Sequence, residues 1–165
     1  MKQAESDSHV SNLGKLVVNL QALEFALRAF LVNEEIARGA SFSQSKDLYQ
    51  MNEGEVVPEN AFTSYDHLGD LINKYNNNAK VVSAGLAIEH NLVRIRDAIA
   101  HGRVSSDTPS GCLRLLKFGK PKNKKVKVTF SVMMTKEWFG EQIKKVYSAV
   151  LTVTEANNRL QSGKL

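Results

Sequence analysis

Apolar residues recur at three- and four-residue intervals along the first forty positions of the chain. This spacing puts them on one stripe of an α-helix, and they are Leu13, Leu16, Val17, Leu20, Leu23, Leu27, Phe30 and Leu31. Ser8 or Ser11 can cap the start of this helix, and Gly39 can stop it. The pattern therefore predicts a long first helix that ends at about Arg38.

Two more helical patterns occupy the middle of the chain. Thr63 or Ser64 caps a short helix, and three consecutive asparagines end it, because asparagine competes with helical hydrogen bonds. A third helix begins between residues 79 and 84 and ends at Gly102, since a glycine just past a periodic run can take the left-handed capping conformation. Residues 40–62 have no sustained period and predict a long loop.

The pattern changes after the third helix. Leu113–Phe118 and Val126–Met134 are β-prone runs on either side of a lysine-rich turn, which predicts a β-hairpin. Thr135 caps a last helix that runs from Lys136 to about Leu160. Its expected core face is Phe139, Ile143, Val146, Tyr147, Val150 and Thr154. We therefore expect a mainly α fold, an antiparallel bundle of about four helices with a β-hairpin inserted before the last helix.

Length and composition restrict the class of protein. A chain of 165 residues, 42% of them hydrophobic, suffices for a single domain over residues 1–165. Cys112 is the one cysteine, which excludes an internal disulfide, and the first residues lack the apolar core of a signal peptide. Both features suggest a cytoplasmic protein. Polar residues interrupt the first helix, so we expect no membrane span. The net charge of +5 permits an anionic partner without requiring one.

The third helix has a polar face opposite its apolar stripe. The stripe consists of Ile88, Leu92, Ile95 and Ile99. The far side of the helical wheel holds Glu89, His90, Val93, Arg94, Asp97, Ala100 and His101. Arg96 lies on the flank between the two faces. No histidine or cysteine cluster has metal-ligand spacing, so neither a metal nor another cofactor is expected.

Glu24 lies inside the apolar stripe of the first helix. An unpaired carboxylate is costly to desolvate there. Two interpretations stay open: Arg96 or Arg94 supports Glu24 as an ionic partner, or Glu24 lies at the edge of the stripe and reaches solvent.

Arg96 is followed by four residues and then by His101. Asp97 comes directly after the arginine, and Gly102 comes directly after the histidine. This arrangement resembles the signature of HEPN domains. The order of a long first helix, a helix with this motif, a hairpin and a closing helix also looks like a HEPN-like bundle. In that family two protomers dimerise and place the arginine and histidine in a shared cleft, and active members cleave RNA without a metal. Toxin-like members often carry a tyrosine where this chain has Arg103.

The resemblance implies a mechanism. Metal-free RNA cleavage needs a base, an acid and positive charge on the phosphate. His101 can exchange protons near neutral pH, Arg96 can grip a phosphate, and Asp97 can orient the imidazole. One motif histidine per chain is too few for both proton transfers, which favours a homodimer. The alternative is that His101 is an ordinary helix-terminal histidine and that Arg96 and Asp97 form a structural ion pair.

Lysines crowd the predicted hairpin, and their mutual repulsion excludes a buried tip. They are Lys117, Lys120, Lys122, Lys124, Lys125 and Lys127. One interpretation makes Lys120, Lys122, Lys124 and Lys125, together with Arg103, an RNA-binding surface. The other makes them a solvated tip that discourages aggregation of the sheet.

Three functions follow as hypotheses. The first is a metal-independent endoribonuclease of the HEPN type, a homodimer in a toxin–antitoxin or phage-defence system with an antitoxin or other defence protein as its partner. The second is a catalytically inactive HEPN-like binding or dimerisation module. The third is general nucleic-acid binding through the lysine-rich hairpin, which would be strongly salt-dependent.

Overall fold

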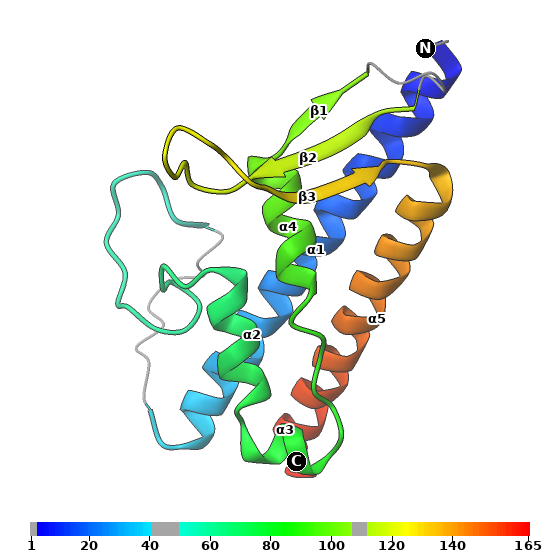
Figure 1. Cartoon of the computed structure of the whole chain (residues 1–165). Helices are drawn as coiled ribbons and strands as arrows, with labels where there is room; N and C mark the ends of the chain where they lie inside the picture. The colour runs from blue at the N-terminus through cyan, green and yellow to red at the C-terminus, as the bar shows by residue number, and fades with distance from the viewer. Residues whose placement is uncertain (1–2, 41–49, 107–111) are drawn as a thin grey trace. The chain divides into compact units, whose positions relative to one another are not determined.

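The computed structural model describes residues 3–40, 50–106 and 112–165. Within these residues the chain is mainly helical and has a small antiparallel sheet (Figure 1). The helices are α1 (Gln3–Ala37), α2 (Leu68–Asn76), α3 (Ala79–Ser83), α4 (Leu92–His101) and α5 (Lys136–Gln161). The strands are β1 (Arg103–Ser105), β2 (Arg114–Phe118) and β3 (Val128–Met133). The mainly α fold and the predicted β2–β3 hairpin are confirmed.

The chain divides into two compact units. Unit 1 comprises Met1–Leu23 and Glu89–Val150, and unit 2 comprises Glu24–Ile88 and Leu151–Leu165. The long helices α1 and α5 each contribute residues to both units. The single domain expected over residues 1–165 stays a prediction.

Helix α1 buries most of its predicted apolar positions. In α1 the buried residues are Leu16, Leu20, Leu23, Leu27, Phe30 and Leu31. This helix starts at Gln3, so Ser8 and Ser11 lie inside it and the predicted cap there was wrong. By length and composition, residues 7–37 could cross a membrane, a test that buried helices of soluble proteins also pass.

Helix α5 begins at its predicted cap, and its buried face agrees with the predicted one only in part: Phe139 and Val146 are buried, and Ile143 and Val150 are half-buried. The Trp138 backbone N–H donates to Thr135 Oγ1 at 3.1 Å, which confirms the cap. Tyr147 and Thr154 were predicted in the core but are exposed. The buried residues follow a three–four spacing that includes small and polar side chains: Phe139, Gln142, Val146, Ala149, Val153, Ala156 and Leu160.

In unit 1 the sheet packs on α4. The strands lie in the order β1-β2-β3, and both pairings are antiparallel (Figure 1). Leu115, the second residue of β2, is buried and lies opposite Val104 of β1 and Val132 of β3. The sequence did not predict β1, because three residues are too few to show a period of two.

Gly102 ends α4, although not in the predicted left-handed conformation. Its φ is −79° and its ψ is 176°, which is extended backbone. A Cβ atom at this position would overlap the carbonyl oxygen of Ala98 and lie 2.6 Å from Leu115 Cδ1. Glycine is therefore required by the helix's own carbonyl group and by the close approach of β2.

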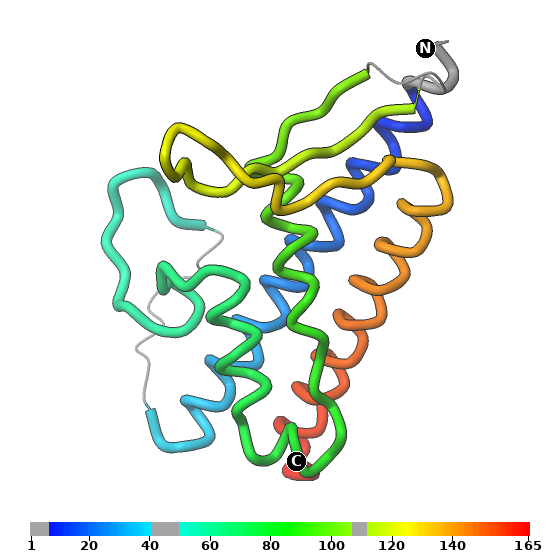
Figure 2. The backbone as a smooth tube through the Cα atoms, viewed as in Figure 1, coloured from blue at the N-terminus to red at the C-terminus, as the bar shows by residue number. Residues whose placement is uncertain are grey.

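In unit 2 the predicted third helix is broken (Figure 2). After α3 the chain turns at Gly85, whose φ is +67°. The Asn76 side chain of α2 then donates to the Ile88 carbonyl at 2.8 Å and accepts from the Ile88 N–H at 3.0 Å, and the Tyr75 hydroxyl donates to the Leu86 carbonyl at 2.9 Å. These side chains hold the segment by its backbone, so one continuous helix up to Gly102 was a wrong prediction.

Tyr75 also gives unit 2 a testable pH dependence. Its ring is buried edge-to-face against Phe30, and burial raises the pKa of its hydroxyl to about 12. Because the neutral phenol is favoured in the fold, its contribution is complete below pH 10 and is lost as the pH rises toward 12. We expect Tyr75→Phe to lower the free energy of unfolding by about 1–2 kcal/mol at pH 7, because the Leu86 carbonyl loses its donor.

Urea unfolding of the wild type and Tyr75→Phe between pH 7 and 11 measures this difference. The difference in free energy of unfolding between the two proteins should decrease above pH 10. Equal stability at pH 7 would contradict the role given to the hydroxyl.

Helix α2 starts after the predicted cap. His67 is the N-cap residue, and its backbone N–H donates to the Asp70 carboxylate at 3.2 Å. Thr63 and Ser64 were the predicted caps, but their hydroxyls form hydrogen bonds within the preceding turn. A cap at either residue was therefore wrong.

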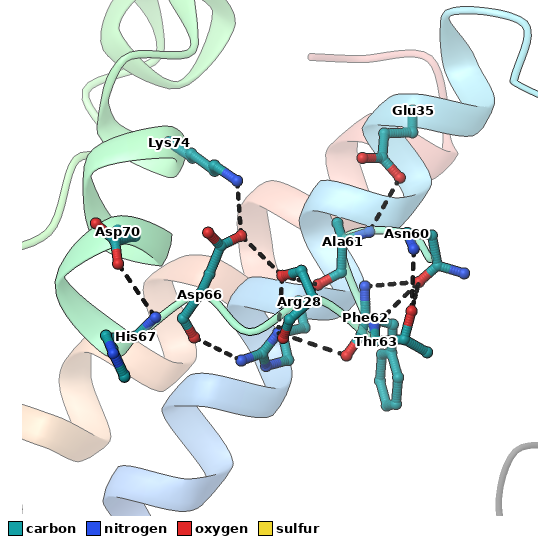
Figure 3. Close-up of polar contacts among 11 residues, drawn as sticks. Arg28, Glu35, Asn60, Ala61, Phe62, Thr63, Asp66, His67, Asp70 and Lys74 are labelled. Carbon is teal, nitrogen blue, oxygen red and sulfur yellow. Dashed lines mark hydrogen bonds and ion pairs between the residues drawn. The ribbon is translucent and has the colours of Figure 1, made fainter. Parts of the chain in front are cut away.

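Arg28 of α1 binds the segment that leads into α2 (Figure 3). Its Nη1 atom donates to the carbonyl oxygens of Ala61 at 3.2 Å, Phe62 at 3.4 Å and Ser64 at 3.0 Å. Its Nη2 atom donates to the carbonyl oxygen of Asp66 at 2.8 Å. One guanidinium thus satisfies four backbone acceptors in a segment without regular structure.

Hydrogen bonds to two carboxylates also hold residues 61–66. The Glu35 carboxylate accepts from the Ala61 backbone N–H at 3.3 Å (Figure 3). The Asp66 carboxylate accepts from Lys74 Nζ at 2.6 Å and from the Ser64 hydroxyl at 2.7 Å. The hydrogen bond from Lys74, and then that from Ser64, lowers the pKa of Asp66 below its ordinary value. Unit 2 therefore binds its long connection by side chains of α1 and α2.

Candidate functional site

Helix α4 presents the residues of the Arg–x4–His motif. Leu92, Ile95 and Ala98 are its buried positions, so the opposite side faces outward. His101 is the last residue of the helix and is exposed, as is Arg94. Ile99, predicted in the core stripe, is only half-buried. Glu89 and His90 are exposed and precede α4, so they do not lie on its helical face as predicted.

Arg96 and Asp97 are half-buried and form ion pairs. Asp97 Oδ1 lies 3.6 Å from Arg96 Nη1, and Asp97 Oδ2 lies 3.1 Å from Lys117 Nζ on β2. The three side chains are 27–36% exposed, so solvent screens these pairs and each contributes at most about 1 kcal/mol. The Asp97–Lys117 pair joins α4 to β2, whereas the Arg96–Asp97 pair lies within α4.

Lys117 is the residue of this group whose contact with α4 the sequence did not predict. It was predicted at the hairpin tip with the other lysines, but its ammonium contacts Asp97. Side chains alternate along a strand, and Leu115, two residues earlier, is buried. That alternation was the available signal that Lys117 points toward α4.

Asp97 was predicted to orient the His101 imidazole. Within the part of the chain that the structure describes, no hydrogen bond or ion pair joins the two side chains, and the Asp97 carboxylate contacts Lys117 and Arg96. The role of Asp97 toward His101 stays a prediction. Glu24 belongs to unit 2, whereas Arg94 and Arg96 belong to unit 1, so the predicted support of Glu24 also stays a prediction.

The side of the sheet away from α4 carries two arginines. The Arg103 guanidinium of β1 lies over the Phe118 ring, 5.5 Å from its centroid. Arg114 of β2 is exposed, and its Nη1 atom donates to the Ser131 hydroxyl of β3 at 3.4 Å. Arg103 was predicted to bind RNA, whereas Arg114 and Phe118 were not singled out.

The lysine-rich tip is a tight turn in open solvent. Lys122 and Lys125 form an isolated antiparallel bridge with backbone N–H to carbonyl distances of 2.8 and 3.0 Å. Between them Asn123 and Lys124 have φ values of 51° and 59°, as a type I′ hairpin turn requires. All residues from Lys120 to Thr129 are exposed, which confirms that the tip is not buried.

The charged residues in this part of the chain are almost all positive. Residues 98–136 contain nine lysines and arginines and a single acidic residue, Asp107, which lies outside the described residues. This segment has a net charge of +8, and the remainder of the chain has −3. Within the described residues, no group of three or more His, Cys, Asp and Glu side chains is placed to hold a metal ion. The arrangement therefore offers cations and one imidazole to an anionic partner.

The chain was also compared with known proteins. No family model, curated protein or solved structure matches it.

Proposed function

We propose that this protein is a metal-independent endoribonuclease of the HEPN type that acts as a homodimer. The observation that carries the proposal is the position of His101, exposed at the end of α4, where the basic segment 98–136 begins. A titratable imidazole next to a surface of unbalanced positive charge is suited to a polyanionic substrate that needs proton transfer. Arg96, half-buried one and a half turns before it, is held by Asp97.

The proposed reaction uses the RNA as its own nucleophile. His101 of one protomer takes the proton of the ribose 2′-hydroxyl, the 2′-oxygen bonds to phosphorus, and the bond from phosphorus to the 5′-oxygen breaks. The equivalent histidine of the partner gives a proton to the 5′-oxygen. Arg96 stabilises the added negative charge on the phosphate. The products are a 2′,3′-cyclic phosphate and a 5′-hydroxyl.

A cleavage assay tests this proposal. The purified full chain is incubated with single-stranded RNA in excess EDTA, and a matched substrate carries one 2′-deoxy nucleotide at the mapped cleavage position. We expect cleavage of the RNA with cyclic phosphate ends and none at the 2′-deoxy position. Cleavage of both substrates, or of neither, would contradict the mechanism.

The second candidate is an inactive HEPN-like binding or dimerisation module. The ion pairs of Asp97 with Arg96 and Lys117 favour it, because they give Arg96 and Asp97 a structural use. A cytoplasmic location, and an antitoxin or defence protein as the partner, belong to the first proposal as its biological setting. They make no difference to the assay in vitro.

A further inference from the structure

The sheet of unit 1 has an accessible face that the motif does not use. Leu115 and Lys117 of β2 point toward α4, where Leu115 lies against Gly102 and Lys117 binds Asp97. Because side chains alternate along a strand, Arg114 and Leu116 lie on the other face. The pairing of β2 with β3 shifts between Lys117 and Phe118, and the contact of Phe118 with Arg103 places its ring on this same face. Arg103 lies opposite Leu116 on β1, and Ser131 lies opposite Leu116 on β3. These five residues, Arg103, Arg114, Leu116, Phe118 and Ser131, are called the platform.

The platform is open to solvent. Arg103, Arg114 and Ser131 are exposed, and Leu116 and Phe118 are half-buried. Leu116 thus lies between Arg114 and Phe118 along β2, and the Arg103 guanidinium of β1 lies over the Phe118 ring. Such a surface offers both a flat apolar area and fixed positive charge.

The charge of the platform selects the class of partner. Within the described residues, no carboxylate pairs with Arg103 or Arg114: Arg103 stacks on Phe118, and Arg114 binds the Ser131 hydroxyl. A guanidinium stacked on a ring has lost part of its hydration and keeps its N–H edge available for a phosphate. The exposed lysines of the tip continue the positive charge from the end of β2.

We propose that the platform binds single-stranded RNA, with a base stacked on Phe118 and Arg103 and the phosphates at Arg114 and the tip lysines. This inference rests on the proposed function for the choice of RNA, but it assigns the binding to a surface away from α4. An aromatic face on an open sheet can receive only a base that is not paired within a duplex. The platform therefore selects single strands, a property that the Arg–x4–His motif does not specify.

Binding is measured with an RNA that cannot be cleaved. A fluorescein-labelled, fully 2′-O-methylated oligouridine of twelve nucleotides lacks the attacking hydroxyl, and fluorescence anisotropy with the full chain gives its Kd. Phe118→Leu keeps an apolar side chain in the sheet and removes the ring. We expect it to weaken binding about tenfold or more, as loss of base stacking does. Arg114→Gln is expected to weaken binding and to lower the slope of log K against log salt by about 1.

Lys144→Gln is the matched control, because it removes one charge from an exposed position on α5. It should leave the Kd within about twofold, as an exposed charge outside the binding surface does. A methylated duplex of the same length should bind more weakly than the single strand. Equal or tighter binding of the duplex, or an unchanged Kd for Phe118→Leu, would overturn the platform.

The two proposals fail separately. RNA cleavage with binding that does not depend on Phe118 would remove the platform and keep the nuclease. Binding that depends on Phe118, without cleavage of unmodified RNA, would keep the platform and remove the nuclease.

Discussion

His101→Ala is expected to lower the rate of RNA cleavage about 100-fold or more, because removal of a group that transfers protons in the transition state costs about 10²–10⁴ in rate. The same change should alter the free energy of unfolding by less than about 0.5 kcal/mol, since His101 is exposed at a helix end. Single-turnover cleavage and thermal unfolding of the same preparation measure the two effects together.

His90→Ala is the matched control for this variant. His90 is exposed, belongs to the same unit and precedes α4, so its loss should leave cleavage unchanged. A nuclease that keeps its rate in His101→Ala would contradict the assignment of the proton transfer. An equal loss of cleavage rate in both variants would indicate an effect on folding or assembly instead of on the chemical step.

Arg28→Ala is expected to cause the largest loss of stability among these variants, about 2–4 kcal/mol. The change leaves the carbonyl oxygens of Ala61, Phe62, Ser64 and Asp66 without their guanidinium donor. Hydrogen bonds to charged groups are the strong ones, and part-buried acceptors without a donor add a desolvation cost. Urea unfolding monitored by circular dichroism measures the loss.

Two further variants separate the geometry of Arg28 from its charge. Arg28→Lys keeps the charge but has no planar fork to reach the same acceptors. It should therefore recover less than half of the stability that Arg28→Ala loses. Arg38→Ala removes an arginine from the end of α1 whose side chain is 72% exposed and pairs with Glu34. It should cost less than about 0.5 kcal/mol. A similar loss for Arg28→Ala and Arg38→Ala would contradict the anchoring of residues 61–66.

The long helices and the hairpin were predictable because their signals are local. Apolar spacing marks α1 over many turns, Thr135 marks the start of α5, and two β-prone runs flank the turn at Asn123 and Lys124. Periodicity was less reliable for the face of α5. It favoured large side chains such as Tyr147, whereas Ala149 and Ala156 are buried.

The break between α3 and α4 could not be read from the local pattern. Tyr75 and Asn76 of α2 hold Leu86 and Ile88 by their backbones, and these partners are 11 and 12 residues away in the chain. A run such as residues 84–91 can satisfy a helical pattern and still be irregular, because side chains from another element replace its internal hydrogen bonds. The sequence pattern predicted only that Asn76 ends α2, whereas its side-chain amide also binds the Ile88 backbone.

The candidate site was predictable in part. Arg96, Asp97 and His101 occupy one short helix, as their spacing implied. The partner of Asp97 comes from β2, twenty residues later, and only the strand register shows it. The platform was missed for the same reason, since Arg103, Phe118 and Ser131 belong to three different strands.

The crowding around Gly102 has a consequence for the placement of His101. A Cβ atom at position 102 would overlap the Ala98 carbonyl oxygen and lie 3.0 Å from that of Leu116, and both are backbone atoms. A larger residue would therefore have to move the end of α4 and β2 apart. The missing side chain thus sets how closely the last turn of α4, with His101 at its end, can approach the sheet.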